Sequence, residues 1–183
     1  MKNDVLISTT RLYDGKIIKL DLDRIRFPDG SEGEMAVVRH QGASAIVPFL
    51  SDPGGADPDL LLLRQYRYAG GGYLYEIPAG RLDAGESPID CARRELREET
   101  GCTAESVQEM CAPLMTPGFA DERIHIFLAT GLTRGETAYE ADEFAEVHVL
   151  KLSRALIMIE HGEIVDAKTI IGLLFAAGFR LRA

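Results

Sequence analysis

The first fifty positions alternate polar and apolar residues in short runs, a pattern typical of β-strands that are covered on one face. Such runs lie at residues 16–20, 23–27 and 35–40, and residues 27–30 (Phe-Pro-Asp-Gly) have the composition of a turn. Residues 43–50 are mostly apolar, which favours a buried strand. We therefore expect a β-rich N-terminal region that leads into a central sheet.

Further strands are expected beyond the loop at residues 51–58, which is rich in proline and glycine. The pattern predicts them at residues 60–66, 107–114, 123–130 and 146–150, and it predicts later helices at 153–162 and 166–177. With one earlier helix, the order is strands, a helix, strands and then helices. This order indicates an α/β sandwich with a mixed sheet between helical layers.

The earlier helix has clear start and stop signals. Ser87 suits the N-cap, Pro88 suits the first helical position, and Asp90 completes a capping-box pattern. Gly101 is suited to end the helix. The sequence therefore predicts a helix between Ser87 and Gly101.

This helix gathers glutamates on one face. Each residue advances the helix by about 100°, so Glu98 and Glu99 lie about 60° and about 40° to either side of Glu95. The stripe expected to pack on the sheet consists of Ile89, Ala92, Leu96 and Thr100, whereas Arg93 and Arg97 point outward. Like charges at these spacings repel, so helix stability alone does not favour the arrangement.

The alternative is an ordinary solvated helix. Its i, i+4 pairs, Asp90 with Arg94 and Arg94 with Glu98, are typical of a surface helix laced by ion pairs. For a generic cluster of this kind that interpretation is the better one. Only the residues around the helix can decide between the two.

Composition limits the classes of protein that need to be considered. The 183 residues suggest one domain with room for a small appended sheet, and 46% of them are hydrophobic, enough for a core. The net charge of −9 disfavours nucleic acid and anionic membranes as partners. It is compatible with a small phosphorylated ligand, because clustered acids can hold divalent cations that reverse the local field.

Location is indicated by the cysteines and by the N-terminal residues. Cys91, Cys102 and Cys111 are odd in number and lack metal-ligand spacing, so we expect free thiols in a reducing cytoplasm. The first ten residues lack the apolar stretch of a signal peptide, and no apolar run is long enough to span a bilayer. A cytoplasmic protein is expected.

Residues 80–102 resemble the signature of the Nudix hydrolase family. The segment follows the pattern Gly, five residues, Glu, seven residues, Arg-Glu-apolar-x-Glu-Glu-x-Gly-apolar, and every fixed position is met. Cys102 stands where a larger aliphatic residue is usual, and a buried cysteine behaves as a small hydrophobe. The resemblance implies a Nudix-type α/β/α sandwich with a mixed sheet, plus N-terminal antiparallel strands.

The resemblance also implies roles for the residues of this signature. Glu95 and Glu99 would be the principal metal ligands, and the carbonyl of Ala79 would add another oxygen. Glu86 and Glu98 would assist, and Arg94 would hold the carboxylates in register. Oxygen ligands of this kind suit Mg²⁺ or Mn²⁺, which would assist in-line attack on a diphosphate.

Segments outside the signature resemble the ADP-ribose pyrophosphatase branch of the family. They are residues 65–67 (Gln-Tyr-Arg), 76–80 (Glu-Ile-Pro-Ala-Gly), 116–122 around Pro117, and the tail 162–169. By this resemblance Arg67 and Glu76 would bind substrate, and Glu122 would contribute through the proline loop. Taken from the residues alone, Arg67 could equally be a surface cation, and Glu76 could equally cap a strand or pair with an arginine.

The catalytic base implied by this branch is a glutamate on a loop after the sheet strands. Glu143 is the first choice and Glu140 the second, within an acidic stretch that also contains Asp142 and Glu146. Solvation of an acidic loop accounts for most of these residues.

The branch further implies a homodimer in which residues 1–42 complete the site of a partner subunit. Residues 43–183 would then form the Nudix hydrolase domain, and Arg26 or Phe27 would reach the partner's cleft. The expected reaction is metal-dependent hydrolysis of ADP-ribose to AMP and ribose 5-phosphate. The alternatives are a pyrophosphatase for GDP-mannose or another nucleotide sugar, and a non-catalytic nucleotide sensor with the same fold.

Overall fold

The computed structural model describes residues 5–135 and 145–180, which fall into two compact units. The N-terminal unit contains Met1–Gly42 and Pro113–Arg123. The larger unit contains Ala43–Ala112 and Ile124–Ala183. The segment around Pro117 is therefore distant in sequence from the N-terminal strands but belongs to the same unit.

The N-terminal unit is built on an antiparallel sheet of three strands in the order β1-β2-β3. The strands are β1 (Leu6–Asp14), β2 (Lys19–Arg26) and β3 (Glu32–Arg39). The run predicted at 23–27 lies in β2, whereas most of the run predicted at 16–20 is wrong as a strand. Residues 16–18 form the turn between β1 and β2, where the Gly15 N–H donates to the Ile18 carbonyl at 3.0 Å. All nine residues of β1 are exposed, so it lacks the one-sided burial that produces a readable alternation, and the sequence pattern did not reveal it.

The segment Pro113–Arg123 is tied to the third strand of this unit. The Val38 N–H donates to the Phe119 carbonyl at 2.8 Å, and the Asp121 N–H donates to the Val38 carbonyl at 3.2 Å. Arg39 adds an ion pair with Asp121 at 3.3 Å. These bonds satisfy backbone groups at the edge of β3, which would otherwise be open.

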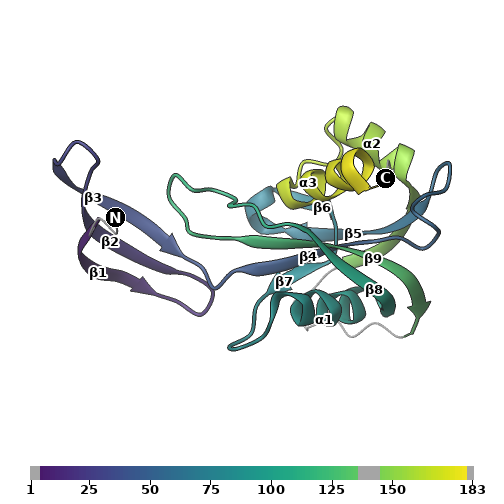
Figure 1. The fold of residues 1–183 in the computed structure, drawn as a ribbon, viewed down its shortest axis with the longest axis horizontal. Helices are drawn as coiled ribbons and strands as arrows, with labels where there is room; N and C mark the ends of the chain where they lie inside the picture. Colours follow the sequence, from purple (N-terminus) through teal and green to yellow (C-terminus); the bar gives the residue numbers. More distant parts are fainter. Residues whose placement is uncertain (1–4, 136–144, 181–183) are drawn as a thin grey trace. The chain divides into compact units, whose positions relative to one another are not determined.

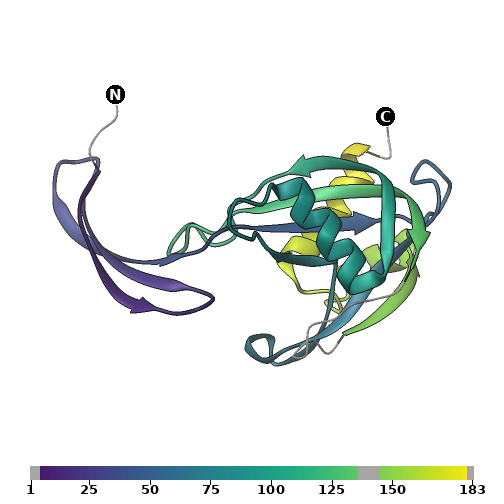
Figure 2. The same cartoon turned by 90° about the horizontal axis from the view of Figure 1, so that it is seen from below.

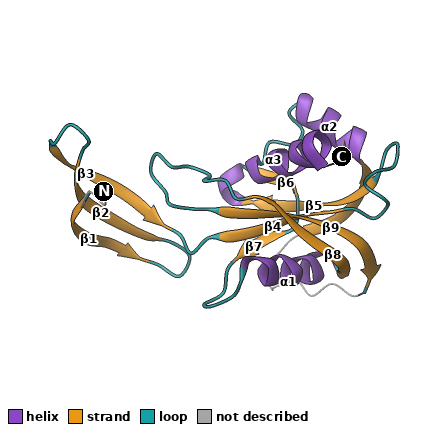
Figure 3. Ribbon diagram, in the orientation of Figure 1, coloured by secondary structure: helices purple, strands orange, loops and turns teal. Residues whose placement is uncertain are grey.

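The larger unit contains two sheets (Figures 1 and 3). The first has the order β7-β4-β9-β8 and is mixed, because β4 runs parallel to β9 whereas the other neighbours are antiparallel. The second is antiparallel, with the order β10-β5-β6. The strands are β4 (Ala43–Pro48), β5 (Asp59–Arg67), β6 (Gly72–Glu76), β7 (Ala79–Arg81), β8 (Cys102–Cys111), β9 (Ile124–Arg134) and β10 (Ala145–Lys151).

Helices cover both sides of these sheets, as Figures 1 and 2 show. Helix α1 (Pro88–Thr100) lies on one side, against β4 and β8. Helices α2 (Leu152–Glu160) and α3 (Ala167–Phe175) lie on the other side, followed by a π-helical turn at Ala176–Arg180. The expected α/β/α sandwich with a mixed sheet is confirmed, with the strands divided between two sheets.

The core beneath α1 shows how the helix is oriented. Ala92 and Leu96 are fully buried against Ile46 and Phe127. Ile89, which we expected in the packed stripe, is 37% exposed, and the buried Cys91 lies on the packed face instead. The helix is thus rotated toward its carboxylates, so that Glu95 and Glu99 are 7% and 2% exposed.

Two expectations of the sequence can be compared directly with this fold. The three cysteines are free thiols, and Cys91 and Cys102 are buried. Among the residues that the structure describes, no helix combines the length and apolar character that crossing a membrane requires.

Candidate active site

Helix α1 carries the site and begins and ends where the sequence predicts. The Ser87 hydroxyl accepts from the Asp90 N–H at 3.3 Å and donates to the Asp90 carboxylate at 2.5 Å. Gly101 ends the helix in the left-handed conformation with φ of 71°, which glycine adopts at little cost. The cap occupies Asp90, so the ion pair between Asp90 and Arg94 considered above does not form.

Arg94 organises two carboxylates of this helix and that of Glu86, which precedes the helix. Its guanidinium donates to Glu86 at 2.9 and 3.0 Å, to Glu95 at 2.6 Å and to Glu98 at 3.1 Å. A further bond, of 3.1 Å, goes to the carbonyl of Arg81 at the end of β7. Three carboxylates therefore converge on one guanidinium, which matches the role that the family resemblance implies for Arg94.

The charges in this cluster shift one another's titration. Hydrogen bonds from Arg94 lower the pKa of Glu86 to about 2, although desolvation opposes the shift. The pKa of Arg94 is raised, chiefly by the bond to Glu86 and against the effect of burial. Both shifts keep the groups charged at neutral pH.

Backbone groups of β7 approach the same carboxylates. The Ala79 N–H donates to the Glu99 carboxylate at 2.9 Å. A Cβ placed on Gly80 would lie 1.7 Å from Glu95 Oε1, closer than any real side chain could come. Any side chain at position 80 would therefore force the Glu95 carboxylate out of the place it occupies beside the strand.

The residues present fit a divalent cation that prefers oxygen ligands. Glu86, Glu95, Glu98 and Glu99 supply carboxylate oxygens, and β7 passes close enough to add a backbone carbonyl. Within residues 5–135 and 145–180, no three acidic, histidine or cysteine side chains already have the spacing of a metal centre. Arg94 supplies the positive charge among these carboxylates in the conformation described.

A second charged group lies on the neighbouring strands. Arg67, the last residue of β5, donates to Glu76 through Nε at 3.1 and 3.2 Å and through Nη2 at 2.8 Å. The sequence left open whether Glu76 caps a strand or pairs with an arginine, and the structure shows the pairing. The pKa of Arg67 is raised: burial opposes the shift, but the bond to Glu76 and the charges of Glu76 and Glu99 outweigh it.

Three predicted substrate residues belong to the N-terminal unit. Glu122 lies 3.6 Å from His40, Arg26 pairs with Glu32 at 3.2 Å, and the half-buried Phe27 lies in the turn after β2. Their assignment to the substrate site therefore stays a prediction. Glu140 and Glu143, the candidates for the base, lie outside the described residues, so both assignments stay predictions.

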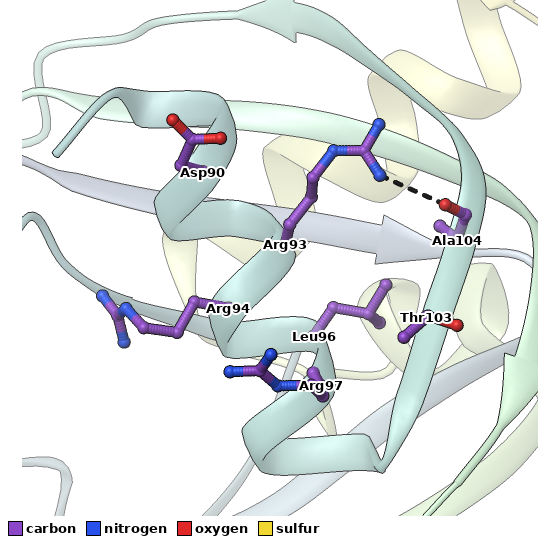
Figure 4. Close-up of a pocket in the computed structure, with 7 residues that line it drawn as sticks. All are labelled: Asp90, Arg93, Arg94, Leu96, Arg97, Thr103 and Ala104. Carbon is purple, nitrogen blue, oxygen red and sulfur yellow. Dashed lines mark hydrogen bonds between the residues drawn. The ribbon is translucent and has the colours of Figure 1, made fainter.

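A cavity of about 300 Å³ lies on another side of α1, against β8 (Figure 4). Its lining consists of Asp90, Arg93, Arg94, Leu96, Arg97, Thr103 and Ala104. Arg93 points across it and donates to the Ala104 carbonyl at 3.1 Å, whereas Arg94 points away from β8 in this view. None of the four glutamates lines this cavity, and Arg94 is the residue that it shares with the carboxylate site.

Sequence reasoning missed Lys168, which lies 3.1 Å from Glu76. Its segment was noted only as part of a tail that resembles the ADP-ribose branch. No local spacing links two residues that are so far apart in the chain. The sequence did contain one indication that Lys168 has a special role. It follows the N-cap residue Asp166 closely, and lysine is unusual at the positive end of a helix.

Comparison with known proteins identifies the family. The model of the NUDIX domain matches residues 40–170. A methanol dehydrogenase activator of Bacillus methanolicus is 36% identical over 92% of this chain and 90% of its own length. An ADP-ribose pyrophosphatase of Bacillus subtilis is 38% identical over 89% of this chain and 86% of its own length.

A solved structure supports the fold independently. The crystal structure of an ADP compounds hydrolase superimposes with a TM-score of 0.79 at 19% identity, over 94% of this chain and 91% of that one. The chain belongs to the NUDIX domain family and is a Nudix hydrolase. Members of this family generally use divalent metal ions.

Proposed function

We propose that this Nudix hydrolase cleaves the diphosphate linkage of ADP-ribose to give AMP and ribose 5-phosphate, with Mg²⁺ or Mn²⁺ as cofactor. The main support is the convergence of Glu86, Glu95 and Glu98 on Arg94, beside Glu99 and the backbone of β7. The ADP-ribose pyrophosphatase of Bacillus subtilis, similar over most of both chains, supports this choice of substrate.

Glu95 and Glu99 would hold the cation, with Glu86, Glu98 and the Ala79 carbonyl as further oxygen ligands. When bound, the cation polarises the diphosphate and neutralises the charge that develops during attack by water. Arg94 keeps the carboxylates apart and oriented, so little rearrangement is needed before binding. Gly80 leaves the space into which Glu95 projects.

Arg67, at the end of β5, would bind the diphosphate. Its side chain is 42% exposed while its partner Glu76 is 4% exposed, so the guanidinium is the accessible end of the pair. A planar guanidinium matches phosphate oxygens in geometry and charge. The proton of the attacking water would be taken by Glu143 or Glu140.

We further propose a homodimer formed through the N-terminal strands. All of β1 is exposed, including apolar side chains that a partner could cover, namely Leu6, Ile7, Leu12 and Tyr13. Arg26 and Phe27 would then complete the partner's substrate cleft. Analytical ultracentrifugation that finds a fully active monomer would contradict this proposal. A cytoplasmic location is likewise proposed, on the basis of the three free thiols.

A substrate panel tests the proposed reaction. Purified protein is incubated with ADP-ribose, ADP-glucose or GDP-mannose in the presence of Mg²⁺, Mn²⁺ or EDTA. Alkaline phosphatase then releases phosphate from the products, but not from the intact substrates. We expect ADP-ribose to give the highest kcat/KM and EDTA to abolish turnover. A higher kcat/KM for GDP-mannose would mean that GDP-mannose, and not ADP-ribose, is the substrate. Turnover that persists in EDTA would refute the metal site.

A further inference from the structure

Lys168 is a buried lysine in the first turn of α3, with only 9% of its surface exposed. Its ammonium lies 3.1 Å from Glu76 Oε2 and 3.0 Å from Asp166 Oδ1. Lysine is rarely buried, because an ammonium loses its hydration unless charged partners replace it. Here two carboxylates from different elements supply that replacement.

The same Glu76 joins Lys168 to Arg67. Glu76 Oε2 accepts from Arg67 Nη2 at 2.8 Å while it faces the ammonium of Lys168. Glu76 is 3% exposed, so this bridging carboxylate is buried between the two cations. The chain of charges runs from α3 through the end of β6 to the end of β5, where the guanidinium of Arg67 reaches solvent.

Hydrogen bonds of the Thr169 hydroxyl fix the start of α3 to the strand segment beside the site. Thr169 Oγ1 accepts from the Ile77 N–H at 2.9 Å and donates to Asp166 at 2.6 Å. Two residues beyond Ile77, the Ala79 N–H donates to Glu99. The ammonium of Lys168 is therefore held at a defined position relative to the metal-binding helix.

The charge balance leaves Arg67 able to attract an anion. Glu76 and Asp166 balance Arg67 and Lys168, and without Lys168 the two carboxylates would outweigh the charge of Arg67. Among the described residues Nη1 of Arg67 makes no hydrogen bond, whereas Nε and Nη2 are held by Glu76. Glu76 thus orients one edge of the guanidinium. The other edge can donate hydrogen bonds to a phosphate.

We propose that Lys168 is a positioning residue for substrate binding, which acts through Glu76 to orient the Arg67 guanidinium and preserve its positive potential. The inference rests on the proposed function, in which Arg67 contacts the diphosphate. Replacement of a buried ion pair by apolar residues is often neutral or stabilising. Stability alone therefore does not require the charged arrangement at this position.

The first test compares Lys168→Met with a matched surface variant. Lys151 also pairs with an aspartate, Asp59, at 2.9 Å, but its side chain is 52% exposed, so Lys151→Met serves as the control. In Lys168→Met we expect about a tenfold rise in the KM for ADP-ribose and less than a threefold change in kcat, because binding and not chemistry is affected. Lys151→Met should keep wild-type constants.

A binding measurement makes the test independent of turnover. Calorimetry of ADP-ribose in EDTA should show about a tenfold rise in Kd for Lys168→Met. Lys168→Arg, which keeps the charge, should recover most of the affinity, and Lys168→Gln provides a second neutral variant if the methionine variant does not fold. A purely structural role predicts that affinity follows thermal stability across these variants.

A double-mutant cycle tests whether Lys168 acts through Arg67. In the Arg67→Gln background, Lys168→Met should raise Kd by less than twofold, since no guanidinium remains to be oriented. Additive losses, or wild-type KM and Kd in Lys168→Met, would overturn the inference even if the wild-type protein hydrolyses ADP-ribose. Failure of the wild-type protein to hydrolyse any nucleotide sugar would instead overturn the proposed function, and Kd would still decide the role of Lys168.

Discussion

Arg39 in the N-terminal unit and Arg94 in the larger unit each donate hydrogen bonds to three carboxylates. Arg39 contacts Asp21, Asp23 and Asp121, whereas Arg94 contacts Glu86, Glu95 and Glu98. Viewed as contacts around one guanidinium, the two clusters are alike. Their surroundings show why only one of them is suited to chemistry.

In the N-terminal cluster each carboxylate has a second donor. Arg11 binds Asp21, the Thr9 hydroxyl donates to Asp23 at 2.8 Å, and the His40 N–H donates to Asp121 at 2.8 Å. These bonds cross strands and hold the sheet together. The cluster is consistent with a structural ion-pair network, whose carboxylates are already satisfied by the protein.

The cluster on α1 differs in its fourth carboxylate and in the backbone beside it. Glu99 lies one turn from Glu95 and receives the Ala79 N–H, and Gly80 admits Glu95 without a side chain in the way. A glutamate side chain has one more rotatable bond than an aspartate, so the glutamates beside Arg94 can change partners more readily than aspartates bonded across a sheet. The arginine alone therefore does not distinguish the two clusters. They differ in whether a metal cation could take the place of the arginine among the carboxylates.

The largest expected effect comes from Glu99→Gln. The amide keeps an oxygen to accept from the Ala79 N–H but removes a negative ligand, so we expect kcat to fall by about 10²- to 10³-fold. Thermal unfolding without metal should change little, because loss of one crowded charge relieves repulsion. Glu160→Gln, at the exposed end of α2, is the control. Wild-type kcat in Glu99→Gln would refute its role.

The sequence revealed the α1 cluster because its information is local. The helix signals at Ser87 and Gly101 and the i, i+3 and i+4 spacing place the glutamates before any fold is known. The N-terminal cluster has no such spacing: Asp21 meets Arg39 only because β2 pairs with β3 in a particular register. Cross-strand register depends on the whole sheet, so the sequence pattern gave no indication of it.

The distinction between local and long-range information also explains the other features that the sequence did not predict. Helix α1 was expected to bury Ile89, but the close approach of Glu95 to Gly80 and the burial of Cys91 turn the helix toward its carboxylates. Strand β1 gave no alternation because the described chain covers neither of its faces. Lys168 was missed because its partner Glu76 is contributed by a distant strand.

A second, smaller effect is expected from Gly80→Ala. The added Cβ would lie 1.7 Å from Glu95 Oε1, so the carboxylate or strand β7 must move. We expect kcat/KM to fall by about 10-fold to 10²-fold, because a small displacement of a metal ligand is costly. Gly178→Ala is the matched control, since a Cβ there has no atom within 4 Å. Equal activity of the two variants would contradict the close approach.

Removal of the two arginines tests the comparison itself. Arg94→Gln leaves three carboxylates without their shared cation, and we expect a loss of about 1–3 kcal/mol in the free energy of unfolding without metal. Mg²⁺ should restore much of that stability, because a ligand that binds only the folded state stabilises it. Arg39→Gln should also lower the melting temperature, but Mg²⁺ should not restore it.

Differential scanning calorimetry with and without 5–10 mM Mg²⁺ (roughly the range that saturates sites of millimolar affinity) measures both variants. If Mg²⁺ rescued Arg39→Gln as well as Arg94→Gln, the distinction between a structural and a metal-ready cluster would fail. If it rescued neither, the carboxylates of α1 would not bind the cation.

The smallest expected effect is the acid dependence of stability without metal. Arg94 lowers the pKa of Glu86 to about 2, from an ordinary value of about 4.5. The unfolded chain therefore binds this proton first, and the stabilisation is present above pH 4.5 and lost as the pH falls toward 2. In Arg94→Gln the pKa of Glu86 should return toward its ordinary value. Urea unfolding in EDTA at several pH values should thus show the gap between wild-type protein and Arg94→Gln narrowing below pH 4.5, and a gap that stayed constant down to pH 2 would mean that Glu86 does not titrate through its bond to Arg94.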